Sequence, residues 1–298
     1  MLYEIHNEDC IIGMQNRIAD QSVDLVIADP PYFKVAKNSW DYQWRTIDDY
    51  VEWSRGWLSE VYRVLREGGT FYLFGYFRTL SHLLPVLEEI GFDLRQQIII
   101  DKGIKAISGR HTSKYKMFPN VTESILFLYK NPRPFVANLL KERQAAVGKS
   151  AKQINEELGV KSNGGGMWSI YTGNNVCEQV PTKELWEQLQ KVLDFEYPYE
   201  KFALTFNIEM GLTDVWSDIN FYAEKGTRFH PTQKPEKLIT RLINASSNEG
   251  DLVLDPFMGS GTTAACAKLM NRNCIGFETD ESYFEKSLRR LKTVTPSN

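Results

Sequence analysis

Short apolar segments alternate with amphipathic segments of helical period at both ends of this chain. Residues 23–28 form an apolar run, and residues 47–66 carry aromatic and aliphatic side chains at spacings of three and four. The same alternation returns at 251–255 and 262–270. Strands that alternate with helices build a mostly parallel sheet with helices on both faces, so the pattern predicts a doubly wound α/β fold.

The middle of the chain breaks this alternation. Residues 131–225 are richer in amphipathic helix and in loops, among them three consecutive glycines at 164–166. At 298 residues the chain has the length of roughly two domains, or of one large domain with an insertion. We therefore predict one domain in two halves, 1–130 and 226–298, interrupted by an inserted module at 131–225.

The composition excludes several classes of protein. Hydrophobic residues make up 42% and charged residues 24%, as in globular proteins rather than disordered, collagen-like or coiled-coil chains. The sequence has no apolar run long enough to cross a bilayer and no signal-peptide pattern at its start, which predicts a cytoplasmic protein without a membrane partner. The four cysteines are scattered, with no Cys-x-x-Cys pair, so we expect reduced thiols and no metal.

Charge is unevenly distributed along the chain. The net charge is -3, yet residues 101–152 contain eleven Lys and Arg against three acidic residues, a local net charge of +8. Such segregation is typical of a face that binds a polyanion. A solvated loop region explains the charge alone equally well.

The segment that follows the predicted strand at 251–255 has the pattern of a ligand-binding loop. Gly259 and Gly261 stand where the chain turns from strand into helix. Glu278 ends the next strand, where a carboxylate can accept hydrogen bonds from both ribose hydroxyls of an adenosine cofactor. The loop lacks the third glycine of dinucleotide folds and a phosphate-binding Gly-Lys, which favours a ligand without phosphates such as S-adenosylmethionine. An ordinary strand-to-helix turn is the alternative.

A second motif, Asp29-Pro30-Pro31-Tyr32, ends the predicted strand at 23–28. The two prolines hold Asp29 extended at the carboxyl edge of the sheet, where ligands bind in such folds. The amine of a nucleobase is a poor nucleophile until its N–H groups are bound. The Asp29 carboxylate and the Pro30 carbonyl can each accept one hydrogen bond from it while Tyr32 stacks on the base. The amine would then attack the methyl group of a sulfonium, with no covalent intermediate; a rigid turn is the alternative.

Taken together, these motifs resemble those of the amino-methylating DNA methyltransferases, in the β-class order where the catalytic motif precedes the cofactor motif. The resemblance is carried by residues 29–32, by 255–261 and by His-Pro-Thr-Gln-Lys-Pro at 230–235. It covers about residues 1–130 and 228–292. It implies a mostly parallel sheet of seven strands, an inserted target-recognition module, S-adenosylmethionine as cofactor and DNA as partner.

The resemblance also implies a role for each matching residue. Asp29, Pro30, Pro31 and Tyr32 would hold a flipped-out target base. The cofactor would be bound by Asp9, Cys10, Thr232, Lys234, Asp255, Phe257, Gly259, Ser260, Gly261, Thr262 and Glu278. Among these, Thr232 and Lys234 would contact the methionine carboxylate. Asp9 would bind the adenine amine, although it could equally cap a helix.

Asp at the head of the catalytic motif resembles the adenine-N6 branch of the family, whereas Ser is commoner in the cytosine-N4 branch. Asp29 therefore predicts site-specific methylation of adenine N6 in DNA. Cytosine-C5 methylation needs a thiolate, typically in a Pro-Cys context, and no cysteine of this sequence follows a proline. The alternatives are cytosine-N4 methylation and a catalytically silent, sequence-specific DNA-binding protein on the same fold.

An enzyme that flips a base out of the duplex also needs a grip on the DNA backbone. We predict phosphate contacts from Lys102, Lys105, Arg110, Lys114 and Lys116. The segment 150–159 is either the first helix of a helix-turn-helix or a capped surface helix. The resemblance further allows a homodimer and a companion restriction endonuclease.

Overall fold

The computed structural model forms two compact units, Met1–Lys130 with Thr205–Asn298, and Asn131–Leu204. It describes residues 1–34, 42–103, 106, 116, 118–160, 166–173, 176–207, 209–221 and 233–296. The second unit begins where the sequence predicts the insertion, but it ends at Leu204 rather than at 225. The reason is that β6 (Val215–Trp216) returns to the first unit and pairs with β4 (Phe92–Asp101).

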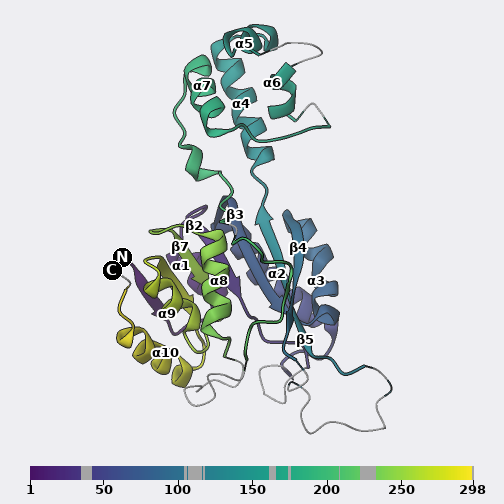
Figure 1. The fold of residues 1–298 in the computed structure, drawn as a ribbon, viewed down its shortest axis with the longest axis vertical. Helices are drawn as coiled ribbons and strands as arrows, with labels where there is room; N and C mark the ends of the chain where they lie inside the picture. Colours follow the sequence, from purple (N-terminus) through teal and green to yellow (C-terminus); the bar gives the residue numbers. More distant parts are fainter. Residues whose placement is uncertain are drawn as a thin grey trace. The chain divides into compact units, whose positions relative to one another are not determined.

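The described part of the first unit contains one eight-stranded sheet of order β1-β8-β7-β2-β3-β5-β4-β6 (Figure 1). Its other strands are β1 (Tyr3–His6), β2 (Val23–Ala28), β3 (Leu65–Gly75), β5 (Thr122–Lys130), β7 (Leu252–Asp255) and β8 (Asn273–Phe277). Only β5 runs antiparallel to its neighbours, so the predicted mostly parallel sheet is confirmed. The expected number of seven strands was wrong, because the two-residue β6 extends the edge.

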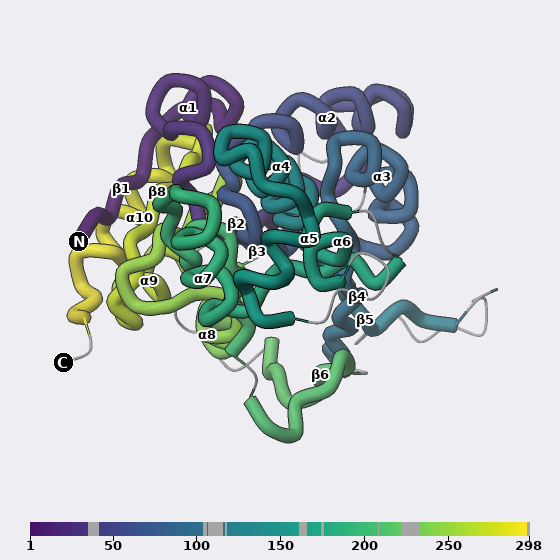
Figure 2. Tube along the Cα trace, turned by 90° about the horizontal axis from the view of Figure 1, so that it is seen from above, coloured from purple at the N-terminus to yellow at the C-terminus, as the bar shows by residue number. Residues whose placement is uncertain are grey.

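Helices cover both faces of this sheet (Figure 2). On one face lie α1 (Cys10–Arg17), α2 (Ile47–Val64) and α3 (Phe77–Ile90), and on the other α8 (Glu236–Ser246), α9 (Thr262–Leu269) and α10 (Glu281–Thr293). Alternate residues of one strand belong to the two cores: Phe71 and Leu73 pack with the first set, Tyr72 and Phe74 with the second. This period of two explains why the strands are apolar throughout.

The helix predicted over 47–66 differs at its end. It begins with a capping box between Thr46 and Asp49, but it stops at Val64. Gly68 and Gly69, which follow the predicted helix, lie inside β3, where the pairing with β2 is irregular. Gly68, at φ 70°, supplies the left-handed residue that such an irregularity favours.

The second unit is helical and has its own core. Its helices are α4 (Arg133–Val147), α5 (Ala151–Glu157), α6 (Gly166–Tyr171) and α7 (Lys183–Leu193). Trp168 and Tyr171 are buried in that core, and Tyr197 and Tyr199 pack against it. Ser150 caps α5 as predicted. The turn after α5 includes 161–165, which lie outside the described residues, so the helix-turn-helix stays a prediction.

Gly13 allows α1 to lie directly against β8. A Cβ atom at this position would lie 2.2 Å from Cε1 of Phe277, whose ring is 1% exposed. We expect Gly13→Ala to lower the free energy of unfolding by about 1–3 kcal/mol, because the buried ring cannot move aside without strain. Urea denaturation measures this change.

The matched control is Gly56→Ala in α2. Gly56 is exposed, and the nearest atom to a Cβ there would be Cδ1 of Ile11, at 3.2 Å. Since alanine is the better helix former, we expect this variant to raise the free energy of unfolding by about 0.5–1 kcal/mol. Equal destabilisation of both variants would contradict the steric explanation.

Candidate active site

A cavity of about 530 Å³ lies at one edge of the sheet in the first unit. Four acidic residues line it, each at or just after the carboxyl end of a parallel strand: Asp9 after β1, Asp29 after β2, Asp255 in β7 and Glu278 after β8. The carboxyl ends of parallel strands are where ligands bind in such sheets. The volume lies within the range of small-molecule sites.

The structure brings most of the predicted site residues together at this cavity. Those that line it are Asp9, Cys10, Asp29, Pro30, Pro31, Tyr32, Lys102, Lys234, Asp255, Phe257, Gly259, Ser260, Thr262 and Glu278. Gly261 and Lys116 do not line it. Thr232, Lys105, Arg110 and Lys114 lie outside the described residues.

The loop after β7 depends on its two glycines. Gly259 and Gly261 have φ values of 51° and 70°, in the left-handed region that favours glycine. A Cβ atom at Gly261 would lie 2.8 Å from Cβ of Ser287 in α10, so Gly261 allows α9 to begin close to that helix. The Met258 N–H donates to the Phe277 carbonyl at 2.8 Å and ties the loop to β8.

Glu278 is held by the backbone of its own site. One carboxylate oxygen accepts from the Gly259 N–H and the other from the Asp280 N–H, each at 2.8 Å. Burial raises the pKa of Glu278, and these two hydrogen bonds oppose that rise. A carboxylate oxygen can accept more than one hydrogen bond, so the fixed Glu278 can also receive ribose hydroxyls, as the sequence predicts.

Asp255 ends β7 and is 6% exposed. Its Oδ1 accepts from the Phe257 N–H at 2.9 Å. Burial raises the pKa of Asp255 to about 7, and the charges of Asp29 and Glu278 act in the same direction. This carboxyl therefore titrates near neutral pH rather than near pH 4, its ordinary range.

Asp9 caps α1 through Oδ1, which accepts from the N–H groups of Ile11 and Ile12 at 2.9 and 3.3 Å. The capping role is thus confirmed. Asp9 and Cys10 also line the cavity, while their contact with a cofactor stays a prediction. Burial, followed by the charge of Asp9, raises the pKa of the Cys10 thiol, which keeps it protonated.

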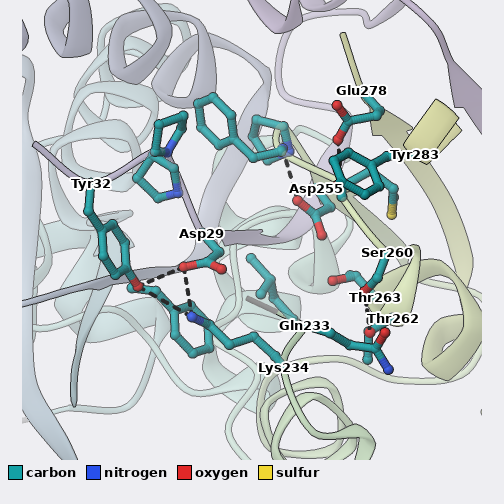
Figure 3. Close-up of a pocket in the computed structure, with 18 of the residues that line it drawn as sticks. Asp29, Tyr32, Gln233, Lys234, Asp255, Ser260, Thr262, Thr263, Glu278 and Tyr283 are labelled. Atoms are coloured by element: carbon teal, nitrogen blue, oxygen red, sulfur yellow. Dashed lines mark hydrogen bonds and ion pairs between the residues drawn. The ribbon is translucent and has the colours of Figure 1, made fainter. Parts of the chain in front are cut away.

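Asp29 and Tyr32, from the predicted catalytic motif, lie within a cluster of charged groups (Figure 3). Oδ1 of Asp29 accepts from the Tyr32 hydroxyl at 2.7 Å and from the Lys234 ammonium at 2.9 Å. Figure 3 shows the other carboxylate oxygen of Asp29 pointing away from both partners. The resemblance implied that Lys234 contacts a methionine carboxylate. The structure places its ammonium between Asp29 and Glu123, 2.7 Å from Glu123 Oε1, and its contact with a cofactor stays a prediction.

Sequence reasoning missed Glu123. It lies in β5, is 4% exposed and lines the cavity. The available signal was an acidic residue at the start of an apolar strand within a strongly basic segment. Lys102, predicted as a phosphate contact, has its ammonium 3.3 Å from Glu123 Oε2 and retains only 15% side-chain exposure. It therefore belongs to the cavity wall.

Two further aromatic residues complete this end of the cavity. Tyr76 packs edge-on against Tyr32, with ring centroids 5.4 Å apart. The Lys102 ammonium lies 5.2 Å from the ring centroid of Tyr76 and 5.6 Å from that of Phe221. Neither Tyr76 nor Phe221 stands in a recognisable motif. Aromatic walls of this kind suit a flat, polar ring such as a nucleobase.

Among the described residues, no group of three or more His, Cys, Asp or Glu side chains is arranged to hold a metal ion. The helices in the same part of the chain include none that is long and apolar enough to span a membrane.

Residues 23–289 match the family described as DNA methylase, and the chain belongs to this family of N6 and N4 amino-methyltransferases. It is 31% identical over 286 residues to the type II methyltransferase M.HpaI of Haemophilus parainfluenzae, across 92% of this chain and 69% of that protein. It is 27% identical over 304 residues to the type II methyltransferase M.HinfI of Haemophilus influenzae, across 97% and 68%.

The fold is also similar to that of a solved structure, the complex of M1.HpyAVI with S-adenosylmethionine. The TM-score is 0.58 at 20% sequence identity, over 98% of this chain and 99% of that one. The family and the fold are consistent with the sequence expectation of an amino-methylating DNA methyltransferase.

The titration of Asp255 predicts a pH-dependent stability. Between its ordinary pKa of 3.8 and its raised pKa of about 7, the carboxyl is protonated in the folded chain and ionised in the unfolded one. Its stabilising contribution is complete below the lower value and is lost as the pH rises through the upper one. Asp255→Asn stays neutral, so we expect it to gain about 1.4 kcal/mol over wild type per pH unit in this window.

Urea unfolding of both proteins at pH 5, 6 and 7 measures this difference. Asparagine retains a carbonyl oxygen for the Phe257 N–H, so the hydrogen bond at 2.9 Å need not be lost. Parallel stability curves for the two proteins would show that Asp255 is not buried in the protonated form.

Proposed function

We propose that this protein is a type II, S-adenosylmethionine-dependent methyltransferase that methylates N6 of a flipped-out adenine at a specific DNA site. The family supports amino-methylation, and the two type II relatives support a companion restriction endonuclease. Asp29 supports adenine over cytosine, because Asp heads the motif in the adenine-N6 branch. The observation that carries the proposal is the Asp29 carboxylate, fixed through one oxygen at the cavity while the other points away from its partners.

The residues of the cavity fit S-adenosylmethionine. Gln233 lines the cavity, and its amide oxygen is buried with no hydrogen-bond partner among the described residues. Such an acceptor suits an ammonium group, which the amino-acid tail of the cofactor carries. Glu278 can accept the ribose hydroxyls, and the cofactor carries no phosphate that would need a Gly-Lys loop. The complex of M1.HpyAVI with the same cofactor also supports this choice.

The bound cofactor would supply a methyl group on a positively charged sulfur. The lone pair of the amine nitrogen forms the new bond to the methyl carbon, while the carbon–sulfur bond breaks and its electron pair stays on sulfur. Asp29 and the Pro30 carbonyl accept the two N–H groups of the amine, which frees the lone pair from the ring. The nitrogen then loses one proton. Tyr32 and Tyr76 would hold the base by stacking.

In this proposal, two different regions of the chain bind the DNA phosphates and recognise the target sequence. Residues 102–116 contain five Lys and Arg and no acidic residue, whereas the second unit contains nine basic and nine acidic residues. Phosphate binding depends on net positive charge, and base recognition does not. We therefore assign phosphate contacts to Lys105, Arg110, Lys114 and Lys116, and target recognition to Asn131–Leu204.

Product analysis tests the proposed reaction. The purified protein is incubated with labelled S-adenosylmethionine and unmethylated DNA, and the digested nucleosides are identified by mass. We expect labelled N6-methyl-2′-deoxyadenosine from wild type and a loss of about 100-fold or more in Asp29→Asn, whose amide is a weaker acceptor. Cofactor affinity should stay within a few fold. Labelled N4-methylcytosine would overturn the adenine assignment, and no labelled base despite cofactor binding would support a silent DNA-binding protein.

The basic segment predicts the salt dependence of DNA binding. If Lys114 and Lys116 each contact one phosphate, replacing both by Ala should reduce the slope of log K against log salt by about 1.8. Fluorescence anisotropy over a salt series measures the slope. The double variant Arg289→Ala and Lys292→Ala, on the exposed surface of α10, is the control and should keep the wild-type slope. An unchanged slope in the first variant would place the DNA elsewhere.

A further inference from the structure

The charged cluster beside Asp29 joins chain segments that are far apart in the sequence. Lys234 lies just before α8, Glu123 in β5 and Asp29 after β2. The Lys234 ammonium is 2.9 Å from Asp29 Oδ1 and 2.7 Å from Glu123 Oε1. Lys234 and Glu123 are 8% and 4% exposed. Burying charged groups of this kind costs desolvation free energy. We therefore expect the ion pair to serve a function at the predicted catalytic motif.

The two carboxylates that share Lys234 are not equivalent. Burial acts to raise the pKa of Glu123, but Lys234 and Lys102 outweigh it and hold that pKa at about 2. Burial also raises the pKa of Asp29, which Lys234 lowers and the charge of Glu123 raises further. Glu123 therefore stays ionised, and Asp29 is the carboxyl that can take up a proton.

We propose that Glu123 and Lys234 are positioning residues for methyl transfer. Glu123 holds the Lys234 ammonium against one oxygen of Asp29, and this leaves the other oxygen to receive the target amine. The inference rests on the proposed amino-methylation, but not on the choice of adenine over cytosine. It departs from the role that the family resemblance implied for Lys234, which was contact with the methionine carboxylate.

The pair acts through the proton affinity of Asp29. When the nitrogen has formed its bond to the methyl carbon and the electron pair of the broken carbon–sulfur bond rests on sulfur, one N–H proton passes to the second oxygen of Asp29. It is later released to solvent. Lys234 and Glu123 keep their charges throughout. Lys234 stabilises the ionised Asp29 that binds the amine, and Glu123 preserves enough basicity in Asp29 to accept the proton.

Other charged groups around the pair enter the same balance. Tyr32 donates to Asp29 and lies 2.7 Å from Glu123 Oε1, so its single proton is shared between the two carboxylates. Lys102, the residue after β4, has its ammonium 3.3 Å from Glu123 Oε2. Asp255 faces Asp29, and each negative charge makes ionisation of the other less favourable. Tyr32 and Lys102 are unchanged in the variants below, and Asp255 is changed only in its own control variant.

The pH dependence of kcat/KM tests the proposal through two shifts of opposite sign. Lys234→Met removes the positive charge that lowers the pKa of Asp29. The acidic limb of the pH profile should therefore move to higher pH by about one unit or more. Glu123→Gln removes a negative charge, so the limb should move down by about one unit. Lys234→Arg keeps the charge and should keep the wild-type limb. Asp255→Asn removes the titration of Asp255, so the acidic limb that remains in this variant can be assigned to Asp29.

A purely structural role would reduce the rate without opposite shifts. The control for that case is Glu67→Gln, because Glu67 is buried and paired with Lys130 at 3.3 Å but does not line the cavity. We expect it to lose stability and to retain the wild-type profile. Shifts of the same sign in the two test variants, or no shift in either, would overturn the proposal.

Cofactor affinity separates the proposal from the role implied by the resemblance. Calorimetric titration of Lys234→Met with S-adenosylmethionine should give a Kd within about twofold of wild type, since Lys234 is assigned to Asp29. A rise of tenfold or more would assign Lys234 to the cofactor instead. The product test is independent of both: labelled N4-methylcytosine would overturn the adenine assignment, and opposite pH shifts would still support the pair. A wild-type protein that methylates no base would overturn both.

Discussion

Burying several carboxylates at one edge of a sheet is unfavourable unless each is compensated, and the active site is organised around that constraint. Asp29 and Glu123 are compensated by the Lys234 ammonium that they share. Glu278 is held by two backbone N–H groups. Asp255 accepts hydrogen bonds from the Thr263 side chain and the Phe257 N–H, and it otherwise avoids the cost by staying protonated up to about neutral pH, as its raised pKa of about 7 indicates.

These different forms of compensation divide the cavity into two sides. Figure 3 shows Asp29, Tyr32 and Lys234 together on one side, and Asp255 and Glu278 on the other. The first side carries two carboxylates and the ammonium groups of Lys234 and Lys102, so its charges balance. A neutral base fits there. The second side carries Glu278, held by two backbone N–H groups, and Asp255, whose ionisation a nearby positive charge would favour. Such a side favours a ligand with positive charge, as the proposed sulfonium cofactor has.

Much of this arrangement could be predicted from the sequence, because strand ends and glycine turns are local. Asp29 and Glu278 follow from the apolar runs that precede them, and Asp255 from the family resemblance. Glu123 was not, because it lines the cavity only through β5, which runs antiparallel to its neighbours and begins at the edge where β2 ends. Apolar periodicity does not encode strand direction. The same limit applies to Lys234 and Lys102, since the anion that a long cationic side chain meets depends on the order of the strands.

The second unit meets a different constraint. Its core, which includes Trp168 and Trp186, is separate from the two clusters that pack on the sheet. In the sequence it stands between β5 and β6, so the strands that end at Asp29 and Asp255 do not pass through it. A change in its surface can therefore, under the proposed function, alter the DNA sequence that is recognised without moving Asp29 or Asp255. Under the proposed function, recognition is separable from chemistry because the compensated charges all belong to the sheet edge.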